Sequence, residues 1–201
     1  LWVNRMAEED KGLVEKMTLF WHGHFACRTV DNPYKTMEMN NLLRENALGN
    51  FRDLLYAVAR SSSMIDYLHL KQNKKAHPNE DFARELCELF TLGRDVDYTE
   101  KDVAEIARAF TGWTFKNGKH FVNPRQHDEG EKTIFGNRGN FGGEDVLEMI
   151  LENPKCADRI AYKVYKFFVQ EEVVDKEVKE MSIALYESGY DIKTMMKRMF
   201  T

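Results

Sequence analysis

The segment that decides the fold is NEDFARELCELFTLG, residues 79–93. Asn79 is a favourable N-cap residue, and the two acidic residues after it suit the positive end of a helix dipole. Gly93 is typical of the position just beyond a helix C-terminus. Between these ends, apolar residues recur at three- and four-residue spacing: Phe82, Leu86, Leu89 and Phe90. The pattern predicts an amphipathic helix over residues 79–92 with these four side chains facing the core.

The same periodicity extends over most of the chain. It predicts further helices over residues 8–25, 36–48, 50–60, 99–112, 144–152, 154–169, 176–187 and 191–200, and a break and new cap at Ser61–Ser63 before Met64, Ile65 and Leu68. In the first of these helices, Leu13, Met17 and Trp21 share a face with His24. In the helix of residues 99–112, Thr99 and Asp102 occupy the positions of a capping box. We expect an all-α protein of about eight or nine helices, with residues 1–201 as a single helical domain.

One stretch departs from helical periodicity and is rich in glycine. Of the 12 glycines, six are Gly118, Gly130, Gly136, Gly139, Gly142 and Gly143. Residues 114–122 alternate around Asn117-Gly118, which favours a hairpin with a two-residue turn. Residues 123–143 show no helical period. We therefore expect an irregular insertion over residues 114–143 that contains a small β-hairpin and packs on the helices. Long loops of this kind are usually functional or disordered.

The composition indicates a globular protein. Of the 201 residues, 43% are hydrophobic and 31% are charged, close to the average for soluble domains. The formal net charge of −4, with both signs interspersed, argues against a nucleic-acid partner. No apolar run approaches the roughly 20 residues that a membrane-spanning helix needs.

The ends and the cysteines allow two further expectations. The chain starts at Leu1, which favours a fragment of a longer protein, with the rest of the parent chain as a partner. The lack of a signal peptide therefore says little about the compartment. Cys27, Cys87 and Cys156 are odd in number, lie far apart and have apolar, helix-like surroundings. We expect them to be buried free thiols.

His22 and His24 raise the question of metal binding. On a helix, positions i and i+2 point to nearly opposite sides, so the two side chains share a metal ion only if the helix ends near His22. Gly23 would allow such an end. The favoured alternative is a buried, hydrogen-bonded His24 that orders the core. A divalent metal stays open as a cofactor.

The charges of the 79–92 helix fall into two groups. Glu80, Arg84 and Glu88 have i,i+4 spacing, which predicts a solvated row of ion pairs that contributes little stability. Glu85 lies beside the apolar face, where a buried carboxylate needs a partner. An arginine or lysine from another element would satisfy Glu85, and so would a metal ion.

The segment RQHDEGEK, residues 125–132, collects groups that could carry chemistry. His127, Asp128 and Lys132 could supply general acid–base catalysis, a metal ligand or an anion contact. The alternative is a solvated polar loop. Arg138 and the glycines after it could let backbone amides approach an anion. The sequence holds no P-loop, dinucleotide-binding turn, nucleophile elbow or His-Glu-x-x-His motif.

Six strings occur along the chain in a fixed order. They are FWHGHF (20–25), RENALGNF (44–51), PNEDFAREL (78–86), ELFTLG (88–93), ARAFTGW (107–113) and HDxGxK (127–132). Together they resemble the large bacterial family labelled DUF1800, a domain of unknown function, from about Phe20 to the C-terminus. The resemblance implies a parent protein that is longer at both ends and exported, with a periplasmic or cell-envelope location.

The family label assigns no reaction, but its motifs specify a set of mostly polar positions. They are His24, Asn79, Glu80, Arg84, Glu85, Arg108, Trp113, His127, Asp128 and Lys132. Residues of this kind build either a site or a buried polar network. We expect a polar cleft whose floor is the 79–92 helix and the helix that carries His24, with the glycine-rich insertion as its lid.

Two functions fit these residues. An enzyme in this cleft would be hydrolase-like or metal-assisted and would act on a polar substrate, with a small molecule or a polymer as its ligand. Its catalytic residues would be His127 as base or ligand, Glu85 or Asp128 as the group that orients it, and Lys132 and Arg84 as charge stabilisers. Its substrate-binding residues would be His24, Asn79, Glu80, Arg108 and Trp113. The alternative is a non-catalytic binding or scaffold domain of an exported cell-envelope protein, in which the same residues hold the loop on the helices.

Overall fold

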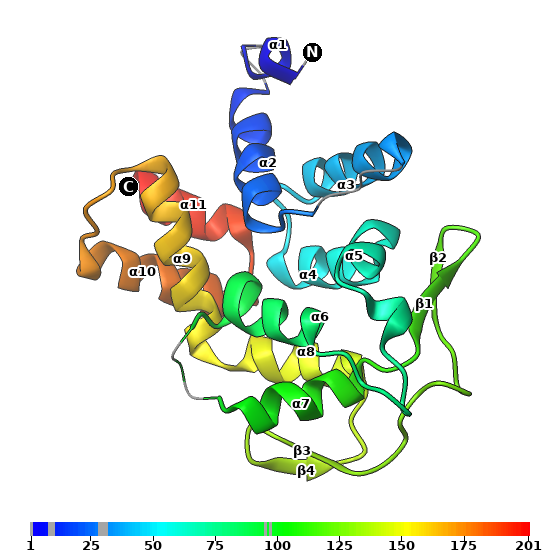
Figure 1. Cartoon of the computed structure of the whole chain (residues 1–201). Helices are drawn as coiled ribbons and strands as arrows, with labels where there is room; N and C mark the ends of the chain where they lie inside the picture. The colour runs from blue at the N-terminus through cyan, green and yellow to red at the C-terminus, as the bar shows by residue number, and fades with distance from the viewer. Residues whose placement is uncertain (1, 8–10, 28–31, 95, 97) are drawn as a thin grey trace.

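The computed structural model describes residues 2–7, 11–27, 32–94, 96 and 98–201 (Figure 1). Within these residues it has eleven α-helices and two antiparallel strand pairs, which confirms the predicted mainly helical class. The N-terminal helices are α1 (Trp2–Met6), α2 (Gly12–His24), α3 (Pro33–Glu45), α4 (Phe51–Arg60) and α5 (Ser62–Tyr67), followed by the short 3₁₀ turn η1 (Leu70–Gln72). The central elements are α6 (Asp81–Glu85), η2 (Leu86–Thr91), α7 (Glu100–Ala109), β1 (Trp113–Lys116), β2 (Lys119–Val122), β3 (Lys132–Ile134) and β4 (Asn137–Gly139). The C-terminal helices are α8 (Gly143–Glu152), α9 (Pro154–Phe168), α10 (Asp175–Glu187) and α11 (Ile192–Phe200).

The helices surround one core of aromatic and aliphatic side chains. Figure 1 shows α9, α10 and α11 grouped at one side of the molecule and the β1–β2 hairpin at the other, with α6, α7 and α8 between them. The largest buried side chains include Trp21, Trp113, Tyr165 and Phe51. The indole Nε1 of Trp21 donates to the carbonyl oxygen of Ala47 over 3.0 Å, so the one polar atom of this buried ring is satisfied.

Two of the predicted N-terminal boundaries differ from the structure. The helix predicted over residues 8–25 corresponds to α2, and residues 8–10 of that prediction lie outside the described residues. Leu13, which the pattern placed on the inner face, is 41% exposed. The helix predicted over residues 36–48 is α3, which starts three residues earlier. Asn32 accepts a hydrogen bond from the N–H of Tyr34, and Pro33 takes the first helical position, where its missing donor costs nothing.

The segment 79–92 is helical but not as one regular α-helix. Helix α6 begins at Asp81 with Glu80 as its N-cap, not Asn79, although the side chain of Asn79 accepts from the N–H of Asp81. After Glu85 the helix changes into the π-helical turn η2. A π-turn holds one extra residue per turn, so it rotates the side chains that follow it. Leu89, expected in the core, is therefore 39% exposed, whereas Cys87 is fully buried.

The glycine-rich insertion has more regular structure than its sequence indicates. The β1–β2 hairpin turns at Asn117-Gly118, as predicted. The stretch 123–143, expected to be irregular, contains a second hairpin, β3–β4, whose turn is Phe135-Gly136 with φ of 50° and 80°. This hairpin packs against α7, and the capping box predicted at Thr99 and Asp102 starts that helix.

The cysteines and the helix lengths complete the comparison with the sequence. Cys87 and Cys156 are buried free thiols, whereas Cys27 is half-buried and also free. Among the described residues, no helix is long and apolar enough to cross a membrane.

Candidate functional site

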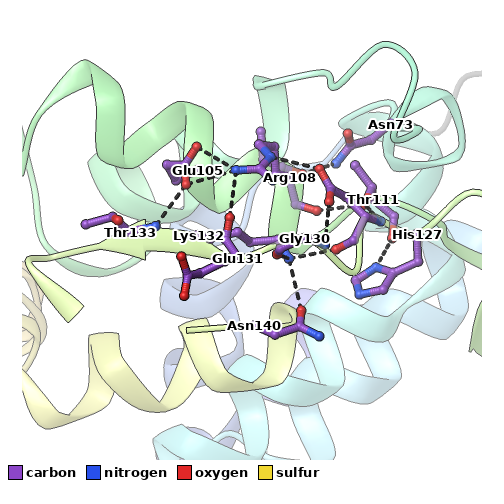
Figure 2. Close-up of polar contacts among 12 residues, drawn as sticks. Asn73, Glu105, Arg108, Thr111, His127, Gly130, Glu131, Lys132, Thr133 and Asn140 are labelled. Atoms are coloured by element: carbon purple, nitrogen blue, oxygen red, sulfur yellow. Dashed lines mark hydrogen bonds and ion pairs between the residues drawn. The ribbon is translucent and has the colours of Figure 1, made fainter. Parts of the chain in front are cut away.

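Arg108, in the last turn of α7, is the centre of the polar contacts around the insertion. Its Nε donates to Oδ2 of Asp128 over 2.8 Å. Its Nη1 donates to both carboxylate oxygens of Glu105 (2.9 and 3.0 Å), as Figure 2 shows. The guanidinium of Arg108 lowers the pKa of Asp128, and the two carboxylates raise the pKa of Arg108. The sequence marked Arg108 and Asp128 but missed Glu105.

Lys132, at the start of β3, has a side chain that is only 1% exposed. Its Nζ donates to the carbonyl oxygens of Asp128 (2.6 Å) and Gly130 (2.9 Å), and Oδ1 of Asn140 lies 3.5 Å away (Figure 2). Burial lowers the pKa of Lys132, and the nearby carboxylate of Asp128 opposes that shift. The ammonium group thus closes the loop between residues 128 and 132 by occupying a cage of oxygen atoms.

Glu105 and a second acid of α7, Asp102, bind backbone N–H groups of β3 and of the turn that follows it. Oε2 of Glu105 accepts from the N–H of Thr133 over 2.9 Å, and Oδ1 of Asp102 accepts from the N–H of Phe135 over 2.8 Å. In a two-stranded hairpin each strand has one edge without a neighbouring strand, and groups on that edge need other partners. Glu105, Arg108, Asp128 and Lys132 form one set of polar contacts, which we call the loop network.

His127 lies at the edge of the loop network. Its Nδ1 is 2.8 Å from the carbonyl oxygen of Thr111, and the hydroxyl of Thr111 accepts from the N–H of Asp128 over 2.7 Å. A Cβ on Gly112 would lie 2.7 Å from the carbonyl oxygen of Asn123, so only glycine lets the two segments approach this closely. Thr111 and Gly112 therefore position the loop.

Arg84 belongs to a second cluster, on the outer face of α6. Its guanidinium donates to both carboxylate oxygens of Glu100 (2.9 and 2.7 Å), to Glu80 (3.0 Å) and to Glu88 (3.5 Å). These carboxylates raise the pKa of Arg84. The pairs with Glu80 and Glu88 are the i,i+4 pairs that the sequence predicts. None of these contacts joins Arg84 to the loop network, with which we expected it to converge.

Glu85 and Asn79 have different surroundings from Arg84. Burial, with the charge of Glu88 next in size, raises the pKa of Glu85, and in the described part of the chain Glu85 makes no ion pair. The backbone N–H of Asn79 donates to the side chain of Asn73 over 3.0 Å, and Asn73 in turn donates to the carbonyl oxygen of Ala107 over 2.8 Å. Asn73, which the sequence did not indicate, is 1% exposed and connects the start of α6 to α7.

Trp113 is 1% exposed, and its indole packs against the rings of Phe110 and His120, with centroids 4.8 and 4.3 Å away. Its ring therefore contributes to the core beneath the β1–β2 hairpin. A Cβ on Gly143 would lie 2.6 Å from atoms of both Phe110 and Trp113, so the start of α8 packs directly on these rings.

His24, the last residue of α2, lies apart from both the loop network and the Arg84 cluster and faces the end of η2. It is 5% exposed, and its Nε2 is 2.9 Å from the carbonyl oxygen of Phe90. Burial lowers the pKa of His24 well below its ordinary value, and the positive charges of Lys163 and Arg159 add to the shift. The ring is thus neutral and Nε2 is the donor, which leaves Nδ1 as a buried acceptor without a partner among the described residues.

The two histidines of the FWHGHF string do not form a metal site. His22 is exposed and its ring contacts Trp2 at 5.6 Å, whereas His24 faces the interior, as the helical spacing predicts. Across the residues that the structure describes, no group of three His, Cys, Asp or Glu side chains is placed to hold a metal ion.

A pocket of about 470 Å³ opens beside His24, between α2 and α9. Its wall combines aromatic and aliphatic side chains with three basic residues of α9. The lining residues are Leu19, Phe20, Gly23, His24, Arg159, Tyr162, Lys163, Lys166 and Phe167. Of the expected site residues, His24 alone lines this pocket.

The fold and these sites define a mainly helical domain with an internally bonded polar loop and a separate basic pocket. A family model described as a protein of unknown function (DUF1800) matches residues 1–201, so the chain belongs to the DUF1800 family. No curated protein and no solved structure matches this chain.

Proposed function

We propose that this domain acts by binding rather than by catalysis, and that its HDxGxK motif holds the insertion on the helices. The observation that carries the proposal is the bonding of Lys132, whose buried Nζ donates to two main-chain carbonyls of its own loop. An amine in this position cannot reach a substrate without breaking both bonds.

The bonding of the other motif groups supports the same proposal. Oδ2 of Asp128 accepts from Arg108, and its Oδ1 accepts from the N–H of Gly130 over 2.8 Å. The carboxylate is therefore ionised and bonded on both oxygens, so it is a weak base and a poor candidate for general acid–base work. In the basic pocket, in contrast, Arg159 and Lys163 make no ion pair with any described residue, and binding sites typically carry a few such polar groups that orient a ligand.

A second function, metal-assisted hydrolysis, is favoured by one observation at His127. With Nδ1–H donating to the carbonyl oxygen of Thr111, the lone pair of Nε2 is available on a half-buried ring. Metal-binding histidines typically have their other ring nitrogen held in this way. Asp128 is the neighbouring carboxylate, but its oxygens are already bonded.

The sign of a stability change distinguishes the two functions. Groups held for catalysis usually lower stability, so replacing them stabilises a protein, whereas replacing a bonded structural group destabilises it. We expect Asp128→Asn and Arg108→Gln each to lower the unfolding temperature, and a double-mutant cycle to give a coupling energy of about 1–3 kcal/mol. Raised stability in either variant contradicts the proposal.

Metal binding gives the second test. We expect Zn²⁺ and Mn²⁺ to leave the unfolding temperature of the wild type and of His127→Ala equally unchanged. A metal-induced stabilisation of the wild type that His127→Ala abolishes would establish the metal-assisted alternative. The cell-envelope location and the lack of a nucleic-acid partner stay predictions.

A further inference from the structure

Helix α9 presents one row of large side chains to the basic pocket. Arg159, Tyr162, Lys163 and Lys166 follow each other at i, i+3, i+4 and i+7, so they share a helix face. The volume of about 470 Å³ lies within the range of small-molecule sites. The pocket is therefore large enough for an organic ligand and has its charges on one wall.

Within the part of the chain that the structure describes, two of these cations have no carboxylate partner. The Nε of Arg159 is buried without a hydrogen bond among the described residues, and no ion pair of Arg159 or Lys163 is present there. The Nζ of Lys163 donates to the carbonyl oxygen of Leu89 at 3.4 Å and to no other described residue. Lys166 differs, because it forms an ion pair with Glu171.

This pair of cations is costly for the protein alone. Burial lowers the pKa of Lys163 to about 8, and repulsion from Arg159 adds to the shift. Like charges that are brought together and partly removed from water destabilise a fold unless an opposite charge joins them. Arrangements that are unfavourable for folding, such as two neighbouring cations without a carboxylate, tend to occur at functional sites.

The π-turn of η2 binds two of the side chains that line the pocket, Lys163 and His24. The last carbonyl groups of a helix have no N–H ahead of them, and here the carbonyls of Leu89 and Phe90 receive Lys163 and His24 instead. These bonds hold both side chains at the pocket. π-Turns of this kind occur frequently at functional sites.

The remaining wall is apolar. The rings of Phe20 and Phe167 contact each other edge to face at 5.4 Å, and Tyr162 stands on the same face of α9 as Lys163. Phe20 also stacks on His24, with ring centroids 5.9 Å apart. An occupant therefore meets aromatic surface on one side and two positive charges on the other.

We propose that the pocket between α2 and α9 binds an organic anion, a carboxylate or a phosphate ester on an apolar body, with Arg159 and Lys163 as its counter-charges. The body lies against Phe20 and Phe167. This inference deepens the proposed binding function by naming its site and ligand class, and it rests on that function.

Calorimetric titration of the 201-residue chain at pH 7 tests this assignment. Phenyl phosphate and phenylacetate carry both parts of the ligand and distinguish phosphate from carboxylate. Inorganic phosphate carries the charge alone, and benzyl alcohol carries the ring alone. We expect saturable binding of at least one of the two complete probes, and binding at least about tenfold weaker for each partial probe.

Matched variants locate the site. Arg159→Gln and Lys163→Met should each weaken binding of the complete probe at least about tenfold. Lys101→Met, which removes an exposed charge from α7, should leave it unchanged. Unfolding curves of each variant show whether it folds. Either of two results overturns the assignment: no saturable binding to the wild type at about 10 mM probe, or equal binding by all variants.

These outcomes do not depend on the loop measurements. A pocket that binds no anion, combined with destabilised Asp128→Asn, removes the ligand assignment and keeps the structural role of the loop. Anion binding combined with a His127-dependent metal effect keeps the pocket and rejects a purely non-catalytic domain.

Discussion

The Nε of Arg108 lies 2.8 Å from Oδ2 of Asp128, so the last turn of α7 holds the loop that leads into β3. Both side chains are largely shielded, with 28% and 19% of their side-chain surface exposed. A charge-assisted hydrogen bond in such a place contributes more than a surface ion pair. The loop network should therefore be measurable as folding stability.

Asp128→Asn should destabilise the protein by about 2 kcal/mol because it removes the charge that Arg108 binds. For a chain of this length the unfolding temperature should fall by about 4–8 °C. Thermal unfolding followed by circular dichroism measures the change. Glu129→Gln alters the exposed neighbouring carboxylate and should stay within about 0.5 kcal/mol.

The stability difference between the wild type and Asp128→Asn should depend on pH. Arg108 holds the pKa of Asp128 below its ordinary value of 3.8. The folded state therefore keeps the carboxylate ionised at pH values where the unfolded chain binds a proton. The stabilisation is complete above the unfolded pKa and is lost as the pH falls through the folded pKa. The difference in unfolding temperature between wild type and Asp128→Asn should be constant from about pH 5 to 8 and shrink in more acidic solution.

Lys132→Met should lower the folding stability markedly, although methionine and lysine are similar in size. The variant leaves the carbonyl oxygens of Asp128 and Gly130 without their buried donor, and each such loss costs about 1–3 kcal/mol. Release of the buried charge offsets part of this cost, so we expect a net loss of about 2–4 kcal/mol in urea unfolding. Lys119→Met removes an exposed lysine of β2 and serves as the control. An unchanged midpoint for Lys132→Met would contradict the structural role of this amine.

The helices could be read from the sequence because their signals are local. Asn50, Thr99 and Asn153 each cap the helix that follows them, and the apolar spacing identifies the buried faces. The π-turn could not be predicted, since nothing in residues 86–91 breaks helical periodicity. Its carbonyl groups bind side chains of other elements, such as His24 on the carbonyl of Phe90, which local sequence does not reveal. The placement of Leu89 in the core was wrong for this reason.

The second hairpin was missed because its turn lacks a turn sequence. Phe135 adopts a positive φ of 50°, a conformation that bulky residues avoid, and its N–H donates to Asp102 of α7, a contact that local sequence does not reveal.

The motifs included Arg108, Asp128 and Lys132 among ten expected site residues, and the structure joins these three. Arg84, which we expected to converge with Asp128 and Lys132, binds Glu100 instead. The motifs gave no sign of Arg159 and Lys163, which lie outside the six strings. An unpaired cation is visible only when its neighbours are known.

Gly143→Ala and Gly23→Ala should have opposite effects. A Cβ on Gly143 would lie 2.6 Å from the rings of Phe110 and Trp113, which are buried and cannot move aside, so we expect a loss of about 1–3 kcal/mol. Gly23 is within α2 and a Cβ there meets nothing within 4 Å. The gain in helix propensity should stabilise Gly23→Ala by about 0.5–1 kcal/mol. Chemical denaturation gives the free energy of unfolding of both variants relative to the wild type. Equal changes in the two variants would contradict the packing of α8 on these rings.

Lys163→Met should raise the unfolding temperature at pH 7, although it removes a residue of the proposed anion site. Lys163 faces Arg159, the neutral ring of His24 and the carbonyl of Leu89, and its pKa is about 8 against an ordinary 10.5. Between these two pH values the unfolded chain binds more protons, so wild-type stability increases with pH across this window. The advantage of Lys163→Met, a few degrees at pH 7, should therefore shrink as the pH rises from 8 towards 10.5. Unfolding temperatures of both proteins measured from about pH 6 to 10 test this, with Lys101→Met as the matched control. A lower unfolding temperature for Lys163→Met at pH 7 would mean that the lysine is already compensated within the fold.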